Sequence, residues 1–574
     1  MTSGRGSHIA DRISRSLIAA LIALLGLITA ARGDVARTPH NFMSGTGESR
    51  GGAAAGSAEM CAFCHTPHPG KAGRARWAKD VAPVTYTLYG SSTLKATMKQ
   101  PTGGSRLCLS CHDGITAPSS ASAGSSGTPV SRARLSGRAV LGTDLSDDHP
   151  VSFAYDPALV ARQGELAPPS VVKQRLFLDP NRELQCMSCH DPHQDRYRMF
   201  LRVDDKGGDL CTTCHTLRNW DTSAHATSPA TLRRGGDNPW PSTPYASVAD
   251  NGCENCHRPH GAPRPPRLLS STLERQVCLV CHDGRVAAKN LEPEFLKNSA
   301  HPVAATDWTH DPIENPNTMA PHSTCTDCHN PHQTRSASAA GSISGLLQGV
   351  SGVNIAGATV REARYEYEVC FKCHGTRERT AAGTVRQENT HNVRLKINPS
   401  NASYHPIAAV GRNSSMQGFE PGYSTASVLI CSDCHNNDEW RAGSNKPRGP
   451  HGSRHAPILE REYQTNDPTS ESSQAYALCY KCHNRNALFS TATRSFPHSQ
   501  HVQEQHASCA VCHDAHGSRQ SGALINFMLQ DSTGKTVVAP ALTQGRIEYV
   551  SLGPGRGQCS LACHGKNHEK ATYP

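Results

Sequence analysis

Every one of the 24 cysteines belongs to a pair that is followed directly by a histidine. Two thiols at this spacing reach the two vinyl groups of one porphyrin, and the next residue then lies under the iron as its proximal ligand. The pattern therefore predicts twelve covalently attached haems c. Eleven of the motifs read C-x-x-C-H: Cys61/Cys64/His65, Cys108/Cys111/His112, Cys186/Cys189/His190, Cys211/Cys214/His215, Cys253/Cys256/His257, Cys278/Cys281/His282, Cys325/Cys328/His329, Cys370/Cys373/His374, Cys431/Cys434/His435, Cys479/Cys482/His483 and Cys509/Cys512/His513.

The twelfth motif, Cys559/Cys563/His564, has one extra residue between its cysteines. A loop one residue longer can still bridge both vinyl groups, so we interpret it as a haem site as well. Zinc sites use similar cysteine pairs, and a disulfide framework is a second alternative. A disulfide framework gives no reason for a histidine after every second cysteine, and twelve repeats of the motif favour haem over both alternatives.

Each haem iron needs a second axial ligand unless it is a catalytic centre. The chain has 32 histidines, enough for two at every iron, whereas its nine methionines follow no pattern. The histidines outside the motifs form two sets. One set follows alternate motifs three residues after the proximal histidine, and in the ninth motif an insertion displaces this histidine. These downstream histidines are His68, His193, His260, His332, His451 and His516.

The second set lies upstream of successive motif pairs. These upstream histidines are His40, His149, His225, His301, His405 and His501. Three of them precede a proline. His391 and His498 compete with His225 and His501 for this role, and the role of His568 stays open. We expect the remaining histidines to be exposed or bonded to haem propionates: His310, His322, His455 and His506.

The alternation divides the chain into six two-haem modules in tandem. Their predicted bounds are 34–140, 141–222, 223–295, 296–395, 396–490 and 491–574. Only 36% of residues are hydrophobic and 5% are aromatic, so we expect the haems to form most of the apolar core. The predicted fold is haem-templated and low in regular secondary structure, with short α-helices, coil and a few small β-hairpins.

Strand character is confined to four segments: 346–369, 524–529, 535–538 and 546–551. Residues 361–370 (REARYEYEVC) form a candidate short helix leading into a haem motif.

The N-terminus predicts export. Three arginines precede an apolar run over 17–30, and small residues follow at 31 and 33, so residues 1–33 read as a signal peptide, with an uncleaved anchor as the alternative. No later apolar stretch approaches spanning length. The formal net charge of +10 is scattered along the chain, so we expect no nucleic-acid partner.

Several strings of the chain resemble the doubled C-x-x-C-H family of multihaem cytochromes c: CAFCHTPH, RLCLSCHDG, DLSDDHPVSFAYD, YEYEVCFKCH, CSDCHNNDEW, YALCYKCHNRN and CAVCHDAHG. The resemblance spans nearly the whole chain after residue 33. It implies bis-histidine, low-potential haems that serve anaerobic respiration, often toward the cell surface. The displaced histidine of the ninth motif and the widened last motif depart from the family pattern.

We expect an electron conduit with no catalytic residues, located in the periplasm or on the outer surface. Its predicted partners are redox proteins that donate and accept electrons, with extracellular metal or a surface cytochrome complex as candidates. A multihaem reductase would need one iron with an open position, and no C-x-x-C-K motif occurs. A structural subunit of a surface complex or filament is the third hypothesis.

Overall fold

The computed structural model describes residues 35–41, 61, 64–65, 77, 83–115, 135–233, 235–264, 266–303, 310–311, 313–315, 318–320, 322–336, 343–376, 383–414, 416, 418–490 and 496–573. The predicted signal peptide and His68 lie outside them. The chain divides into two compact units. Unit 1 is Met1–Leu217 with His257–Leu268, and unit 2 is Arg218–Cys256 with Leu269–Pro574.

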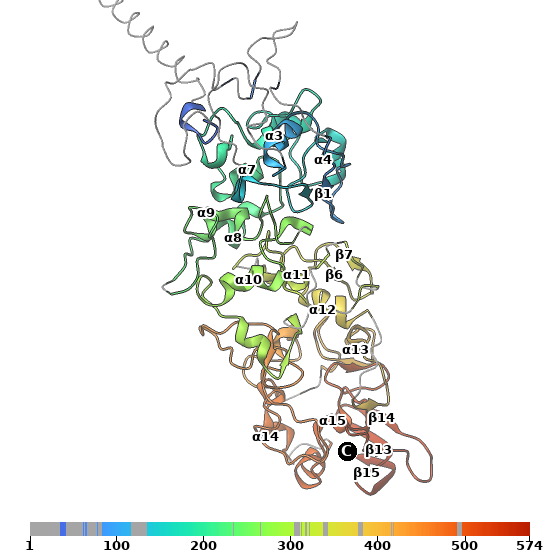
Figure 1. Cartoon of the computed structure of the whole chain (residues 1–574). Coiled ribbons are helices and arrows are strands. Elements are labelled where there is room, and N and C mark those ends of the chain that lie inside the picture. Colours follow the sequence, from blue (N-terminus) through green and yellow to red (C-terminus); the bar gives the residue numbers. More distant parts are fainter. Residues whose placement is uncertain are drawn as a thin grey trace, which may run out of the picture. The chain divides into compact units, whose positions relative to one another are not determined.

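Regular structure is sparse in both units, as expected, and the longest described helix has ten residues (Figure 1). The helices of unit 1 are η2 (Val35–Arg37), α3 (Gly103–His112), η4 (Gly137–Ala139), α4 (Pro157–Gln163), α5 (Pro169–Val172), α6 (Cys186–Cys189), η5 (Arg198–Phe200), η6 (Lys206–Gly208), α7 (Asp209–Thr212) and η9 (Pro266–Leu268). Those of unit 2 are η7 (Trp220–Thr222), α8 (Ala224–Thr227), α9 (Val248–Asn251), η8 (Gly252–Asn255), α10 (Glu274–His282), η10 (Glu292–Leu296), α11 (Cys325–Cys328), η12 (Gly345–Leu347), α12 (Glu366–His374), α13 (Val393–Lys396), η13 (Cys431–Asp433), η14 (Cys479–Lys481), α14 (Arg485–Leu488), η15 (Ser499–Glu504) and α15 (Cys509–Cys512).

The strands form two-stranded ladders, apart from one larger sheet at the C-terminus. In unit 1, β1 (Thr87–Leu88) pairs with β2 (Asp144–Leu145), and β3 (Phe153–Ala154) pairs with β4 (Glu183–Leu184). The two-stranded ladders of unit 2 are β5 (Ser299–Ala300) with β10 (Gly452–Ser453), β6 (Gly352–Val353) with β7 (Thr359–Val360), β8 (Val385–Arg386) with β12 (Met528–Gln530), and β9 (Ser403–Tyr404) with β11 (Gly517–Ser518).

The larger sheet contains the last cysteine motif. Strand β15 (Arg556–Cys563) pairs with β13 (Val538–Ala539), β14 (Glu548–Gly553) and β16 (Lys566–Tyr573). The expected strand segments match β6, β7, β12, β13 and β14, and the candidate helix at 361–370 is α12, which begins five residues later. The sequence did not predict that the last motif lies in a strand.

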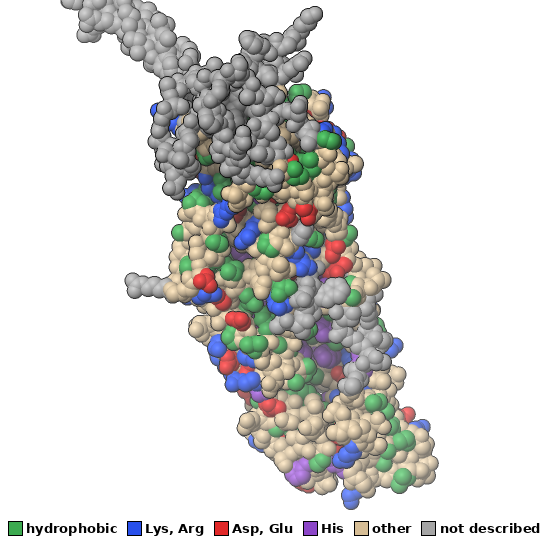
Figure 2. All heavy atoms as spheres, viewed as in Figure 1, with side chains coloured by type: hydrophobic (Ala, Val, Ile, Leu, Met, Phe, Trp, Pro, Cys, Tyr) green, Lys and Arg blue, Asp and Glu red, His purple; other side chains and the backbone are tan. Residues whose placement is uncertain are grey.

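Buried apolar side chains form several small clusters, and most of them include motif cysteines. One cluster of unit 1 contains Cys214, and the cluster beneath the C-terminal sheet packs against Cys512, Cys559 and Cys563. This arrangement agrees with a core completed by porphyrins. Figure 2 shows hydrophobic and histidine side chains together on one face of the molecule. No helix among the described residues is long and apolar enough to cross a membrane.

Candidate functional site

Histidine rings face one another in pairs throughout both units. In eleven pairs the ring centroids lie 6.1–6.5 Å apart. A metal–imidazole bond of about 2.0 Å, with about 1.2 Å from the nitrogen to the ring centre, puts two rings on opposite sides of one iron about 6.4 Å apart. The pair spacing therefore fits bis-histidine haem.

Nine of these pairs follow two rules. An even-numbered motif pairs its proximal histidine with the upstream histidine of its own module: His112 with His40, His215 with His149, His282 with His225, His374 with His301, and His483 with His405. An odd-numbered motif pairs with the downstream histidine of the next odd motif: His65 with His193, His190 with His260, His329 with His451, and His435 with His516. Each module thus supplies ligands to its neighbour.

Some even motifs differ from odd motifs in backbone conformation, although the fourth and tenth, in α7 and η14, have short helices as odd motifs do. In the second, sixth and eighth motifs the proximal histidine is the last residue of a helix of nine or ten residues, namely α3, α10 or α12. In the third, seventh and eleventh motifs the helix has only four residues, and the proximal histidine is already extended. His190, for example, has φ −108° and ψ 139°.

The chain folds back after each extended motif and fixes the proximal ring. In the third motif the Asp191 amide donates to the carbonyl of Phe200, and the Arg202 amide donates to the carbonyl of Cys189. Nδ1 of His190 then donates to the carbonyl of Met199 at 2.8 Å. Because Nδ1 carries the proton, Nε2 is left with a lone pair for a metal.

The same carbonyl contact recurs at other proximal histidines. The bonds join His257 to Arg267 (2.7 Å), His329 to Leu346 (2.9 Å), His435 to Pro457 (3.0 Å) and His513 to Ala523 (2.9 Å). Three of the acceptor residues have left-handed backbones, with φ 55° at Met199, 67° at Arg267 and 53° at Ala523. The chain adopts this unfavourable conformation where it aims a carbonyl at the proximal imidazole.

Upstream histidines bond to the residue that precedes a downstream histidine. Nδ1 of each donates to a carbonyl: His40 to Pro192 (3.2 Å), His225 to Pro331 (2.9 Å), His301 to Pro450 (2.7 Å) and His405 to Ala515. A downstream histidine therefore serves as the ligand of one haem, and the carbonyl just before it orients a ligand of another haem.

Three downstream histidines, His193, His260 and His516, contact carboxylates instead, whereas Nδ1 of His451 is buried and forms no hydrogen bond. Nδ1 of His260 lies 2.9 Å from Oδ1 of Asp148, and Nδ1 of His193 lies 3.4 Å from Oδ1 of Asp191. Such a partner raises the basicity of a ligating imidazole.

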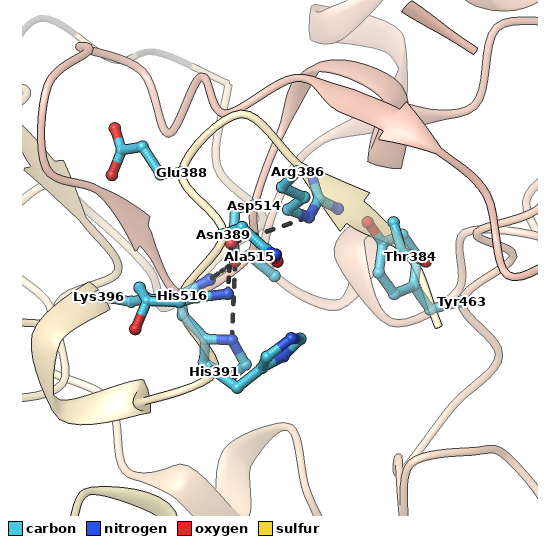
Figure 3. Close-up of a pocket in the computed structure, with 11 residues that line it drawn as sticks. Thr384, Arg386, Glu388, Asn389, His391, Lys396, Tyr463, Asp514, Ala515 and His516 are labelled. Carbon is cyan, nitrogen blue, oxygen red and sulfur yellow. Dashed lines mark hydrogen bonds and ion pairs between the residues drawn. The ribbon is translucent and has the colours of Figure 1, made fainter. Parts of the chain in front are cut away.

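Asp514 holds His516 at the edge of a cavity of about 280 Å³ (Figure 3). Lys396 lies 2.8 Å from this carboxylate, and Arg386 lies 3.8 Å from it. Hydrogen bonding and these cations hold the pKa of Asp514 well below its usual range, against the effect of burial. His391 also lines the cavity.

Burial keeps several paired imidazoles neutral. It lowers the pKa of His149 to about 4 and that of His451 to about 3. A neutral imidazole is the form that ligates iron.

Cysteines of successive motifs lie beside one another. Within a module the second cysteines interact, as Cys189 does with Cys214 and Cys328 with Cys373. Between modules the first cysteines form hydrogen bonds, which join Cys108 to Cys186, Cys278 to Cys325 and Cys370 to Cys431. None of the 24 cysteines, all of which are described, is in a disulfide.

The first module shows the same contacts between motifs. Hydrogen bonding to Cys186 and burial raise the pKa of the Cys108 thiol, and Cys111 and Cys64 add to this effect. Haem attachment at Cys61, Cys64, Cys108 and Cys111 stays a prediction.

The end of the chain departs from the two rules. His513 faces His498, the competing candidate, at 6.5 Å, and His501 faces His568 at 6.3 Å. Nε2 of His564 lies 2.7 Å from Oδ2 of Asp467. His332 lies beside the ring of Trp220.

Of the four histidines expected to be exposed or bonded to propionates, two lie against carboxylates in the interior. His322 is buried and His310 is half-buried beside Glu314 and Asp327, a cluster that the sequence did not predict because its members belong to no repeated motif. His455 forms an ion pair with Glu462, and His506 is exposed as expected.

Comparisons with known proteins agree with the pattern of cysteine motifs. The model of a family described as "Doubled CXXCH motif" matches residues 179–218 and 246–287. Over 167 residues the chain is 28% identical to "Multiheme cytochrome MtrA" of Shewanella baltica (strain OS185). This match covers 27% of the chain and 37% of the relative, so the chain spans little more than a third of that protein's length.

Proposed function

Because the chain belongs to the multihaem cytochromes c with doubled CXXCH motifs, whose motifs bind haem c covalently, we propose that it is an exported dodecahaem electron conduit. Each haem, when bound, supplies one-electron iron redox chemistry. The cysteine pairs hold it, the proximal histidines ligate one face, and the upstream and downstream histidines ligate the other.

The observation that carries this proposal is the succession of motifs. Within a module the second cysteines of the two motifs interact, as Cys328 does with Cys373. Between modules the first cysteines interact, as Cys370 does with Cys431. Porphyrins attached there would follow one another in sequence order within each unit. A row of closely spaced, six-coordinate haems conducts electrons without binding a substrate at iron.

The remaining parts of the proposal concern the setting of the protein. The row would be organised as six two-haem modules and would lie in the periplasm or on the outer cell surface. It would serve anaerobic or extracellular respiration between a redox protein that donates electrons and one that accepts them. The similarity to a multihaem cytochrome supports the electron-transfer role on which this setting rests.

The test combines a haem count with EPR spectroscopy of the fully oxidised full-length protein. We expect twelve haems per chain by pyridine haemochrome assay and mass spectrometry, with every iron low-spin. A high-spin signal worth about one haem per chain would instead indicate an open coordination site and favour a reductase. A count well below twelve would contradict the dodecahaem proposal itself.

A further inference from the structure

Four side chains outside the haem motif histidines converge before and within the seventh motif. They are His310, Glu314, His322 and Asp327, and one ligand atom from each lies within 4.8 Å of all the others. Nδ1 of His310 is 2.7 Å from Oε1 of Glu314 and 2.9 Å from Oδ1 of Asp327. Nε2 of His322 is 3.1 and 3.6 Å from the same two oxygens.

This cluster is unlike the haem pairs. The rings of His310 and His322 are 6.4 Å apart, a spacing that also fits two imidazoles on one metal. Here, however, two carboxylate oxygens lie close to both ring nitrogens, where a porphyrin would need the space. All 24 cysteines already belong to the twelve motifs. The cluster therefore suits a bare cation and not a haem.

Burial makes the convergence costly without a cation. The side chain of His322 is 2% exposed and that of Asp327 is 7% exposed. Nδ1 of His310 and Oε1 of Glu314 are buried and 2.7 Å apart, but their contact does not have the geometry of a hydrogen bond. A buried polar atom without a hydrogen bond destabilises the fold. Lone pairs aimed at a common point are the arrangement that a metal satisfies.

Contacts behind the cluster orient two of its members. Nδ1 of His322 donates to the carbonyl of Ala320 at 2.8 Å, which leaves Nε2 with its lone pair toward the cluster. Oδ2 of Asp327 accepts from the amide of Thr324 at 2.6 Å and from its hydroxyl at 3.0 Å, which leaves Oδ1 toward the cluster. Metal-ligating histidines and carboxylates in proteins are held by such outer contacts.

We propose that His310, Glu314, His322 and Asp327 bind one divalent transition-metal ion, with Zn²⁺ as the best match. Two neutral imidazoles and two carboxylates supply four nitrogen and oxygen ligands and balance the charge of +2. Ca²⁺ and Mg²⁺ prefer all-oxygen sites. Because Asp327 lies between Cys325 and Cys328, the ion would tie the segment at 310–322 to the seventh motif. The competing account is an ion-pair cluster with protonated histidines.

Equilibrium dialysis of the full-length haem-loaded protein against Zn²⁺, after chelator treatment, tests the site. We expect about one zinc per chain by elemental analysis, and at least about 100-fold weaker binding in the double variant His322→Ala/Glu314→Gln. The matched control is His455→Ala, because this histidine faces a single carboxylate, Glu462, at 2.7 Å. The control should bind zinc as the wild type does. Equal zinc binding by the wild type and the double variant would overturn the proposal.

X-ray absorption at the zinc edge of the wild-type protein gives a second measurement that needs no variant. We expect about four nitrogen and oxygen ligands near 2.0–2.1 Å and no sulfur. Sulfur ligands, or a shell of six oxygens, would place the ion elsewhere and overturn the assignment. An unchanged haem count in the double variant would show that its loss of zinc is not a loss of folding.

The last motif carries a second, independent inference, which rests on the proposed haem at Cys559 and Cys563. Strand β15 holds both cysteines, and the following turn has left-handed residues at His564 (φ 49°) and Gly565 (φ 73°). The turn directs His564 to the carboxylate of Asp467. His568, in β16, faces His501 instead.

We infer that His501 and His568 are the axial ligands of the last haem and that His564 is not. The ring spacing of 6.3 Å is that of the other pairs. Nδ1 of His501 donates to the carbonyl of Pro497 at 3.1 Å, so its Nε2 keeps a lone pair. The strand conformation of this motif explains the change of ligand, because the left-handed turn after β15 directs the residue after the second cysteine to Asp467.

Two matched variants distinguish the candidates. In His568→Ala we expect a high-spin EPR signal from one haem of twelve, whereas His564→Ala should stay fully low-spin. The reverse result would overturn the inference. If haem attachment is lost in either variant, His568→Met decides: it keeps a ligand in place and should raise the potential of one haem. An unchanged set of potentials in His568→Met would also overturn it. The haemochrome count reports separately on whether the last haem is attached.

Discussion

At the scale of single residues, the sequence places two kinds of outer contact on the ligating histidines. Proximal and upstream histidines donate to neutral carbonyls, as His190 does to Met199. Three downstream histidines face carboxylates, as His260 does at Asp148. A carboxylate gives its imidazole more anionic character and stabilises ferric iron more strongly than a carbonyl does. The difference is a means of setting unequal potentials along one row.

Asp148→Asn tests this effect. Asp148 is buried, and its Oδ1 accepts from Nδ1 of His260 and from the amide of Gly261 at 3.2 Å. Asparagine retains a hydrogen-bonding oxygen but removes the charge. We expect the potential of one haem to rise by roughly tens of millivolts, measured by EPR-monitored redox titration. Asp156→Asn, at the N-cap of α4, is the control and should change no potential. A rise in the control alone would contradict the argument.

At the scale of elements, the helices and two-stranded ladders are short, so ion pairs connect segments that lie far apart in sequence. Asp438, which is 3% exposed, joins Lys297 after η10 to Arg454 after β10, at 2.8 and 2.6 Å. Burial alone would raise the pKa of its carboxyl, but hydrogen bonds from Lys297 and Arg454 outweigh it and lower that pKa to about 2. The pKa of Asp438 is thus lower in the folded protein than its value of about 3.9 in the unfolded chain. Its carboxylate therefore stabilises the fold fully above about pH 3.9, and this stabilisation is lost as the pH falls through about 2.

Asp438→Asn should therefore lower the free energy of unfolding by about 2 kcal/mol at pH 7. The difference from the wild type should shrink between about pH 4 and pH 2. Denaturant unfolding of the haem-loaded protein at several pH values measures both. Asp209→Asn is the comparison, since Asp209 and Arg175 form an exposed pair, 45% exposed on each side, worth at most about 1 kcal/mol. If the difference in unfolding free energy between Asp438→Asn and the wild type did not change with pH, the Asp438 carboxylate would not be the source of this stabilisation.

The turn after the eleventh motif supplies another prediction at this scale. Ala523 and Leu524 are left-handed, and the carbonyl of Ala523 accepts from His513. Ala523→Gly should stabilise the protein by up to about 1 kcal/mol, because glycine adopts positive φ without strain. Ala523→Val should destabilise it by about 1–2 kcal/mol. Thermal unfolding with a constant haem count measures both, and the opposite order of the two variants would show that the left-handed turn is absent.

At the scale of the whole molecule, the sequence predicted the motifs and the shortage of regular structure, because both depend on residue type and spacing. It also separated odd from even motifs, and the histidine pairs follow this division, as His190 with His260 and His282 with His225 show. It named His501 as the upstream ligand of the last module, with His498 as a competitor, and left His568 open, since the place of His568 depends on how β15 and β16 turn. It missed His310 and His322 because tertiary folding, with no repeat to mark it, brings them to Asp327.

A row of haems also makes a prediction about connectivity. The eighth motif stands between its neighbours, because Cys373 interacts with Cys328 of the seventh and Cys370 bonds to Cys431 of the ninth. Replacing Cys370 and Cys373 by alanine should slow electron equilibration after partial flash reduction by about tenfold or more, since one link of the row is missing.

The control removes the haem at the end of the row instead, through Cys559→Ala and Cys563→Ala. Equilibration among the remaining haems should then keep the wild-type rate, because no other haem depends on that link. Both variants need eleven haems by haemochrome assay and low-spin EPR signals from the neighbours before their rates are compared. If losing the interior haem slows equilibration no more than losing the terminal one, electrons have routes that bypass the sequence order. The haems would then form a branched cluster and not a row.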